Sequence, residues 1–274
     1  MYATLGNNNT KNKTGLKEII KMLKPFSVLL LISLLSLNSF SQDIPDDCYL
    51  LKKIFGKCDY LNNEYKRPFN KEEGHLVSYR DSITYTITYK QNVVLENQNY
   101  LLVIVEAPYF FPFGHTSGYR NFYYFKKNKN EWQLNNSIES DGTTSLGDLP
   151  EYELIDIGKN KQALLITFQS TGNGHYEKTK NLYLLTLKEM TFLLQIANDY
   201  NNGANILPAS DNEDCEMTEY HCTYEVIKSD NEWFDIKTNQ DNYGFSKGCK
   251  ERFIKSKEEH LYHHSEKEYA EVKK

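Results

Sequence analysis

The chain has 274 residues, of which 39% are hydrophobic and 25% are charged, and this suits one large globular domain or two small ones. Acidic residues outnumber basic ones 37 to 32, and few of the basic residues are arginine, so the forked guanidinium groups that read phosphates are scarce. We therefore expect no nucleic-acid partner. The 21 tyrosines and 14 phenylalanines, together with many β-branched residues, favour strands over helices.

The N-terminal 41 residues predict an export signal. A basic stretch ending at Lys24 precedes the apolar run 26–37, which is shorter than the roughly 20 residues needed to span a bilayer but suits the apolar centre of a signal peptide. Ser39 and Ser41 stand where a signal peptidase reads small residues, so cleavage is predicted after Ser41. The alternative is an uncleaved anchor helix. A signal peptide that begins at Met22 has ordinary proportions, so a translation start at Met22, with residues 1–21 over-called, is an open alternative to a start at Met1.

Cleavage after Ser41 leaves 27 basic and 36 acidic residues in the segment 42–274. A net negative charge of this size favours solubility and argues against binding to an anionic membrane surface. The mature chain is therefore predicted to be secreted or periplasmic, without a membrane anchor.

All five cysteines follow the predicted cleavage site, and in an exported chain they predict disulfides. The two most local pairs are Cys48 with Cys58 and Cys215 with Cys222. These two pairs leave Cys249 unpaired. It could instead pair with Cys215 or Cys222, or link two chains.

Metal binding is an alternative to disulfide formation for Cys222, together with nearby histidines. His260, His263 and His264 have a spacing that can converge on one ion, with His221 and Cys222 as further ligands. They lack a spaced pair of cysteines, and a charged C-terminal segment explains the histidines equally well. We predict neither a metal nor a cofactor.

A repeat organises the middle of the chain. Residues 114–134 align without a gap with residues 174–194, so that His115 meets His175, and a third copy appears when the shift is 101 residues. Each copy consists of a strand-like run, a polar turn and a second strand-like run, which indicates a recurring hairpin.

Two more strand-like runs precede each of the first two hairpins. They cover residues 82–90 and 100–106 before the first hairpin, and 151–157 and 162–169 before the second. Residues 82–90 alternate and predict a half-exposed strand, whereas residues 101–105 and 163–166 are continuously apolar and predict strands buried on both faces. A short capped helix is expected near residues 46–56, ended by Gly56.

The fold class is therefore predicted as all-β, built of four-stranded antiparallel meanders near residues 76–140, 150–200 and 215–274 in one β-rich domain, 42–274. The meanders fit a propeller-like array of sheets or, alternatively, a sandwich of two sheets.

Residues 154–166, with sequence Leu-Ile-Asp-Ile-Gly-Lys-Asn-Lys-Gln-Ala-Leu-Leu-Ile, resemble the Asp-containing turn of FG-GAP or VCBS-type propeller repeats. In that family an Asp/Asn/Gly-rich loop often holds calcium, and the resemblance implies adhesion or scaffolding. Here only Asp156 and Asn160 match potential calcium ligands, since Gly158 and Gln162 stand where the family has acidic residues.

The common catalytic motifs for dinucleotides, nucleoside triphosphates and zinc-dependent hydrolysis are absent from the sequence. The most conspicuous segment is instead the aromatic stretch 109–113, which is interrupted by prolines and predicts a loop. Because equivalent turns of stacked meanders emerge at the same edge, we expect one face to gather the candidate ligand-binding residues. These are Tyr109, Phe111, Phe113, His115 and His175.

The resulting hypothesis is an exported, non-catalytic protein that binds a protein or glycan partner. The alternative is a secreted hydrolase whose carboxylate pair is assembled only in the fold.

Overall fold

The structure is a computed structural model that describes residues 44–68, 82–110, 116–140, 149–172, 175–203, 215–265 and 268–272. Contacts divide the chain into two units, Met1–Ile44 and Pro45–Lys274. The predicted signal and its cleavage site lie outside the described residues and stay predictions. Every helix and strand named below belongs to the second unit.

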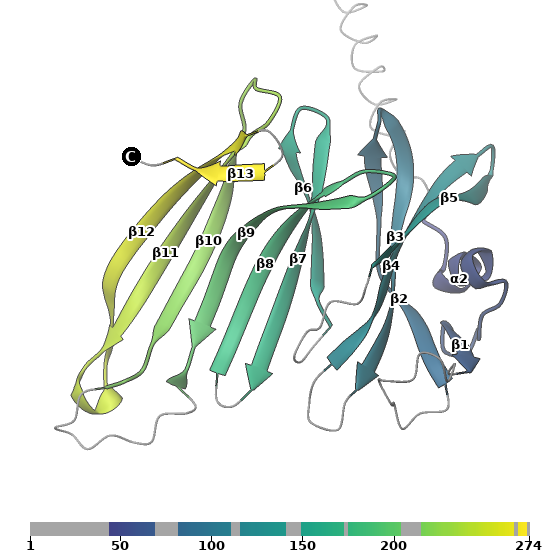
Figure 1. Ribbon diagram of the computed structural model, residues 1–274. Coiled ribbons are helices and arrows are strands. Elements are labelled where there is room, and N and C mark those ends of the chain that lie inside the picture. Colours follow the sequence, from purple (N-terminus) through teal and green to yellow (C-terminus); the bar gives the residue numbers. More distant parts are fainter. Residues whose placement is uncertain are drawn as a thin grey trace, which may run out of the picture. The chain divides into compact units, whose positions relative to one another are not determined.

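The described strands form two antiparallel sheets, each a meander (Figure 1). The first has five strands in sequence order: β1 (Glu64–Pro68), β2 (Ser82–Leu95), β3 (Gln98–Phe110), β4 (Thr116–Asn128) and β5 (Glu131–Ser140). The second has eight, also in sequence order: β6 (Glu151–Gly158), β7 (Lys161–Gly172), β8 (His175–Leu185), β9 (Met190–Asn201), β10 (Glu219–Ile227), β11 (Asp235–Phe245), β12 (Arg252–Ser265) and β13 (Glu268–Glu271).

The all-β prediction and the antiparallel meanders are confirmed. Of the two arrangements expected, the structure has two sheets, because the strands of the predicted second and third meanders continue into one sheet through the pairing of β9 with β10. The first two aligned stretches fall on antiparallel hairpins, formed by β4 and β5 and by β8 and β9, whereas the third contains β10 and ends where β11, the partner of β10, begins. Common descent of these hairpins from a repeat stays a prediction.

The predicted helix is present as α2 (Asp47–Phe55). Asp46 caps it by accepting a hydrogen bond from the Tyr49 N–H at 2.8 Å, and Gly56 ends it in the left-handed conformation at φ 78°. A straight helix would hold Cys48 and Cys58 about 15 Å apart, but the reversal at Gly56 brings their Cα atoms to 5.5 Å. The predicted disulfide between these cysteines is confirmed.

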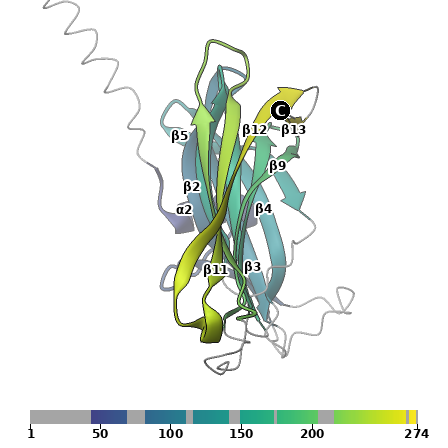
Figure 2. The same cartoon turned by 90° about the vertical axis from the view of Figure 1, so that its left-hand side faces the viewer.

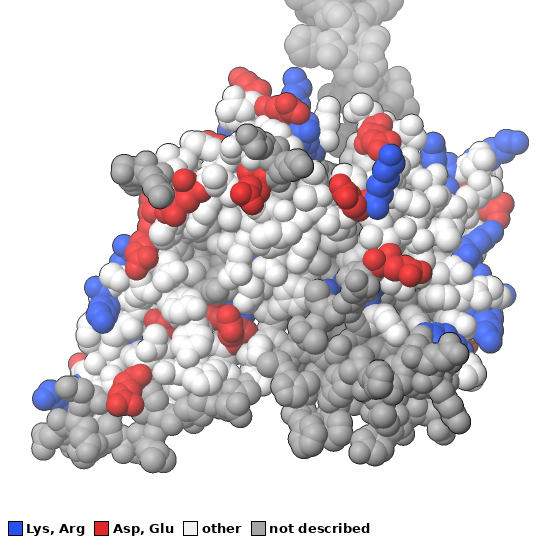
Figure 3. Space-filling view, viewed as in Figure 1, with Lys and Arg blue, Asp and Glu red and all other residues white. Residues whose placement is uncertain are grey.

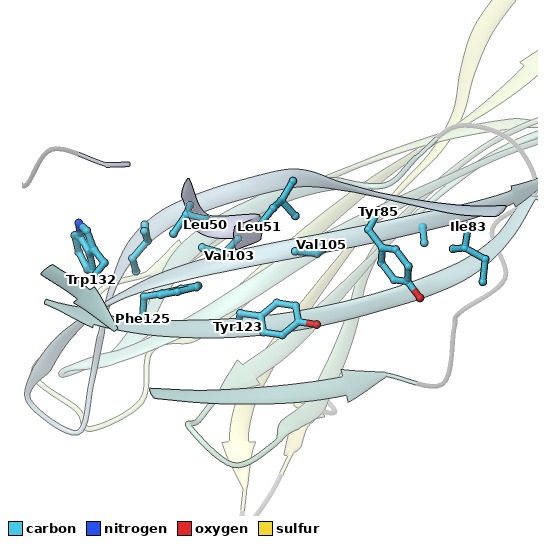
Figure 4. Close-up of a cluster of buried hydrophobic side chains, with 11 residues drawn as sticks. Leu50, Leu51, Ile83, Tyr85, Val103, Val105, Tyr123, Phe125 and Trp132 are labelled. Atoms are coloured by element: carbon cyan, nitrogen blue, oxygen red, sulfur yellow. The ribbon is translucent and has the colours of Figure 1, made fainter. Parts of the chain in front are cut away.

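The helix covers the outer face of the five-stranded sheet. Leu50 and Leu51 are fully buried there against alternate residues of β3, such as Val103 and Val105 (Figure 4). Residues of the opposite parity on β3, such as Leu102, face the other sheet instead. All five residues from Leu101 to Val105 are fully buried, which confirms the prediction that this apolar run is covered on both faces.

A second core cluster joins the two sheets face to face. It combines Leu102 and Tyr124 of the five-stranded sheet with Leu164, Ile166 and Leu185 of the eight-stranded sheet. This contact buries Leu164 and Ile166, while Ala163 and Leu165 are buried in a third cluster on the opposite face, so the predicted apolar run 163–166 is covered on both faces as expected. The interface therefore follows from two strands that are apolar on both faces.

An ion pair is buried within this interface. Arg120 and Glu106 are 5% and 3% exposed, and the Arg120 Nε donates to the Glu106 Oε1 at 2.8 Å. Tyr152, from the other sheet, lies 2.6 Å from both groups and donates its hydroxyl proton to Glu106. Burial raises the pKa of Tyr152, so its hydroxyl stays protonated as the donor of this network.

The eight-stranded sheet is curled (Figure 1), and backbone hydrogen bonds cross its concave side at one place. The Phe234 N–H donates to the Ile157 carbonyl and the Lys159 N–H to the Glu232 carbonyl, both at 2.9 Å, which joins the β6–β7 turn to the segment before β11. A Cβ atom at Gly158 would stand 2.3 Å from the Glu232 oxygen, so this approach requires glycine. The third core cluster, which includes Leu165, fills the curled interior.

One loop prediction is wrong in part. Residues 109–113 were expected to form a loop because Pro108 and Pro112 flank aromatic residues, but β3 continues to Phe110 and pairs with Thr116 of β4. The pairing of β2 with β3 ends at Glu106, so beyond it β3 has a partner on one side only among the described strands. Pro108 is tolerated there because the missing N–H of proline is not needed on a side of the strand that has no neighbouring strand.

Candidate functional site

Of the predicted ligand-binding residues, the structure describes the side chain of His175 alone. His175 begins β8 and is exposed, with its Nδ1 3.0 Å from the Tyr200 hydroxyl. The backbone of Tyr109 lies in β3 opposite Ser117, and its side chain is not described. Phe111, Phe113 and His115 lie outside the described residues, so their part in the site stays a prediction.

His175 is the first of three stacked rings, which we call the aromatic ladder: His175, Tyr200 and Tyr220. The His175 and Tyr200 ring centroids are 5.8 Å apart, those of Tyr200 and Tyr220 are 5.5 Å apart, and the second pair is nearly parallel at 17°. The register explains this stack, because Tyr200 of β9 is directly opposite Tyr220 of β10. Three neighbouring strands therefore contribute one ring each.

The ladder lies at the end of the eight-stranded sheet where β7 finishes and β8 begins. The same end holds the last residues of β3 and the first of β4, since β3 and β7 run in the same direction (Figure 1). Two contacts support this. The Val94 N–H, just before β3, donates to Gln162 at the start of β7, while Arg120, opposite Glu106 near the end of β3, stacks on Phe168 near the end of β7.

One carboxylate lies beside the ladder. Glu177 is directly opposite Tyr200, so the two side chains share a face of the sheet. Asp199, the strand neighbour of Tyr200, belongs to the other face, where it pairs with His221 at 3.0 Å, and it also accepts the Cys222 N–H at 2.8 Å. Burial, and then the charge of Glu177, raise the pKa of Tyr220, so its hydroxyl remains a neutral hydrogen-bond donor near neutral pH. The ladder thus combines apolar rings with hydroxyl donors and a carboxylate acceptor.

A disulfide fixes the chain close to this end of the sheet, and it corrects one prediction. Cys215 bonds to Cys249 across a sequence separation of 34, and Cys222 lies in neither disulfide. Cys222 is buried in the middle of β10, with its thiol donating to Gln240 at 3.4 Å. Cys222 is held inside β10, whereas the β10–β11 hairpin places Tyr243 opposite Glu219 and so returns the chain towards Cys215 shortly before Cys249.

The histidines of β12 have separate partners. His260 is 2.6 Å from Glu271, His263 is close to Asp235, and His264 stacks on Trp233 with ring centroids 3.5 Å apart. In the part of the chain that the structure describes, no group of three or more potential ligands could hold a metal ion. Asp156, singled out by the propeller-repeat resemblance, accepts a hydrogen bond from Gln162 at 3.2 Å.

The sequence did not reveal Tyr200 and Tyr220. Each stands among polar residues at a strand end, and only the register of β9 with β10 brings them together. The one available signal was the placement of His175 at a turn by the repeat alignment.

Comparisons with models of protein families, with curated proteins and with solved structures gave no match. Among the described residues, no helix has both the length and the apolar character needed to cross a membrane. The function proposed below therefore rests on the geometry of the aromatic ladder and its surroundings.

Proposed function

We propose that the protein is an exported, non-catalytic binding protein whose ligand surface is the aromatic ladder. The observation that carries the proposal is the stack of His175, Tyr200 and Tyr220 at a strand end, in which His175 is exposed and the two tyrosines are half-buried, with Tyr220 packed against the third core cluster. Tyrosine gives a large contact area at a low cost in conformational entropy and is enriched among residues that dominate binding.

The chemistry around the ladder favours a neutral glycan. Aromatic rings pack on the apolar faces of sugar rings, and the carboxylate of Glu177 can accept hydrogen bonds from sugar hydroxyls. This carboxylate, together with the acidic excess of segment 42–274, disfavours anionic ligands. A protein partner with an apolar patch is the competing outcome.

The test is a screen of the exported protein against arrays of neutral oligosaccharides, followed by calorimetry with the best binder. Tyr220→Ala should weaken binding about tenfold or more, because truncation of an aromatic anchor removes both packing and a hydroxyl. Tyr60→Ala is the matched control, since Tyr60 is 62% exposed and lies beyond α2 in the other part of the fold. The proposal fails if no neutral glycan binds, or if Tyr60→Ala weakens binding as much as Tyr220→Ala.

Export is supported by the two disulfides, which form and persist in oxidising compartments. We expect the mature chain to begin at Gln42. Intact mass of the protein recovered from the envelope or medium of the producing cell measures this, and a species that retains Lys24 would contradict it.

A further inference from the structure

The loop between α2 and β1 projects an apolar side chain into solvent. Leu61 is 93% exposed, its neighbour Tyr60 is 62% exposed, and residues 59–63 are all exposed. A leucine this open packs on almost nothing in its own chain, so its exposure does not serve the core of the fold. The loop is therefore convex and offers an apolar tip, which we call the α2–β1 tip and which comprises residues 59–63.

Short-range bonds hold the α2–β1 tip in one conformation. The Asp59 carboxylate accepts a hydrogen bond from the Leu61 N–H at 2.9 Å, and the Asp59 N–H donates to the Glu64 carbonyl at 2.7 Å. The disulfide between Cys48 and Cys58 fastens the start of the tip to α2. Because the loop is already ordered, Leu61 loses little conformational entropy when it binds a partner.

Two lysines lie close to the α2–β1 tip. The Lys52 Nζ is 4.9 Å from the ring centroid of Tyr60, and the Lys57 Nζ is 5.6 Å from that of Tyr65. Both lysines are exposed, and neither forms an ion pair with a carboxylate of the described residues. Their charges, which lie over tyrosine rings, are therefore available to an anionic partner.

The charge of the chain is distributed unevenly. Residues 52–68, which span the α2–β1 tip, carry five basic and two acidic side chains, whereas residues 149–274 carry 15 basic and 22 acidic ones. In Figure 3, blue side chains accordingly gather on the side where Figure 1 places α2 and β1. Figure 2 views the molecule from the side of β12 and has α2 among the most distant elements. The basic tip therefore lies on the side of the molecule away from β12 and most of the acidic sheet.

We propose that the α2–β1 tip is a contact site for an anionic lipid surface. Leu61 and Tyr60 insert between the lipids, while Lys52 and Lys57 bind the phosphates of the headgroups. A leucine side chain cannot hydrogen-bond to a hydrated polymer, but it is stable among acyl chains, and tyrosine is enriched at the boundary between lipid and water. A soft bilayer also accommodates a convex tip, for which a folded protein would need a matching pocket. This contact is independent of the ligand proposed for the aromatic ladder.

The acidic excess of segment 42–274 argues against membrane binding by the protein as a whole, but the charges nearest the lipid decide the attraction. Charges farther away than the Debye length, about 8 Å at physiological ionic strength, are largely screened. α2 covers one face of the five-stranded sheet and the acidic eight-stranded sheet packs on the other, and stacked sheets are about 10 Å apart. The uneven charge therefore orients the protein with its α2–β1 tip towards the lipid.

Cosedimentation of the exported protein with vesicles tests the contact. Wild type should bind vesicles that contain phosphatidylglycerol more tightly than vesicles of phosphatidylcholine alone, and high salt should weaken this binding. Lys52→Gln combined with Lys57→Gln should lower the partition coefficient about 25-fold, because each lysine near an anionic surface contributes about fivefold. Lys228→Gln combined with Lys255→Gln removes two exposed lysines from the acidic part of the chain and should leave binding unchanged. Absence of binding by wild type, or an equal loss in both double variants, would overturn the proposal.

Substitutions of Leu61 test insertion itself. Leu61→Ser should lower the partition coefficient about fivefold or more, because the burial of its side chain among lipids is lost. Leu61→Trp should add fluorescence that shifts to shorter wavelength on vesicles containing phosphatidylglycerol and that brominated lipids quench. Ile254→Ser and Ile254→Trp are the matched controls, since Ile254 of β12 is 49% exposed on the far side of the molecule, and both should bind as wild type without a shift. Binding that needs the lysines but not Leu61, with the new tryptophan unquenched, would point to a soluble anionic partner and contradict the proposal.

Discussion

Removal of Arg120 should destabilise the protein strongly, because its guanidinium group is the counter-charge of a buried carboxylate. Arg120 and Glu106 have side chains that are 6% and 4% exposed and lie 2.8 Å apart. Arg120→Met leaves the Glu106 charge inside the interface between the sheets without a cation, and breaking a buried pair in this way costs about 3–5 kcal/mol. The thioether also forfeits the contact of the guanidinium with Phe168, whose ring centroid is 5.4 Å away.

Comparison of variants can apportion this loss of unfolding free energy among the members of the buried network. Tyr152→Phe removes a hydroxyl that donates to Glu106 at 2.6 Å while keeping the ring, and should cost about 1–2 kcal/mol. The double variant Glu106→Leu with Arg120→Met leaves no charge to bury, so it should be less destabilised than Arg120→Met alone. Glu106→Leu should therefore raise the stability of the Arg120→Met variant. Such a gain identifies the buried unpaired charge of Glu106, and not the lost volume of Arg120, as the cause of the destabilisation.

Urea unfolding with the disulfides intact measures these differences at neutral pH. Arg252→Met is the control, since Arg252 forms an ion pair with Glu219 at 2.5 Å but its side chain is 47% exposed, and an exposed pair contributes about 1 kcal/mol or less. The reasoning is refuted if Arg120→Met loses no more stability than Arg252→Met. It is also refuted if the double variant loses the full sum of its two single substitutions.

Three further outcomes follow from the fold. Serine at both Cys215 and Cys249 should lower stability by about 4 kcal/mol in the chain-entropy model, more than the roughly 3 kcal/mol expected for the shorter loop closed by Cys48, as compared by urea unfolding. Gly158→Ala should lower the free energy of unfolding by about 1–3 kcal/mol because its Cβ cannot fit beside the Glu232 carbonyl, and an unchanged thermal midpoint would contradict this. Burial and the charge of Glu153 raise the pKa of Tyr224 to about 12, so stability should be complete below about pH 10, where the unfolded tyrosine begins to ionise, and should fall as the pH rises towards 12. Tyr224→Phe should flatten this loss, which tyrosinate absorbance and urea midpoints measured together would detect.

Local features of the fold could be predicted because their causes are local. Asp46 and Gly56 mark the ends of α2 through hydrogen bonds within a few residues of the chain. The apolar run Leu101 to Val105 predicts a strand covered on both faces, since a strand with one exposed face would alternate. The Cys48–Cys58 disulfide is also a locally determined feature, because it depends only on the reversal of the chain at Gly56.

Pairing between distant strands could not be predicted in the same way. Glu106 is the single charged residue of β3, Arg120 is one of three basic residues of β4, and only the register of β3 with β4 places the two opposite each other. Their third partner, Tyr152, comes from the other sheet and has no link to them in the sequence. The buried network therefore becomes visible only when both the register and the packing of the sheets are known.

Hairpin register also accounts for the incorrect disulfide and for the missed part of the candidate site. In the β10–β11 hairpin, Cys222 lies opposite Gln240, so the strand that holds it cannot also bend back to Cys215. Tyr220, two residues earlier on the same strand, is then fixed opposite Tyr200 of β9. A shift of β10 by one residue would turn Cys222 and Tyr220 to the opposite face, which would expose the buried thiol and separate the rings of the ladder. The burial of Cys222 therefore supports the register on which the aromatic ladder depends, and a substitution that disturbs this core position should also disturb the ladder.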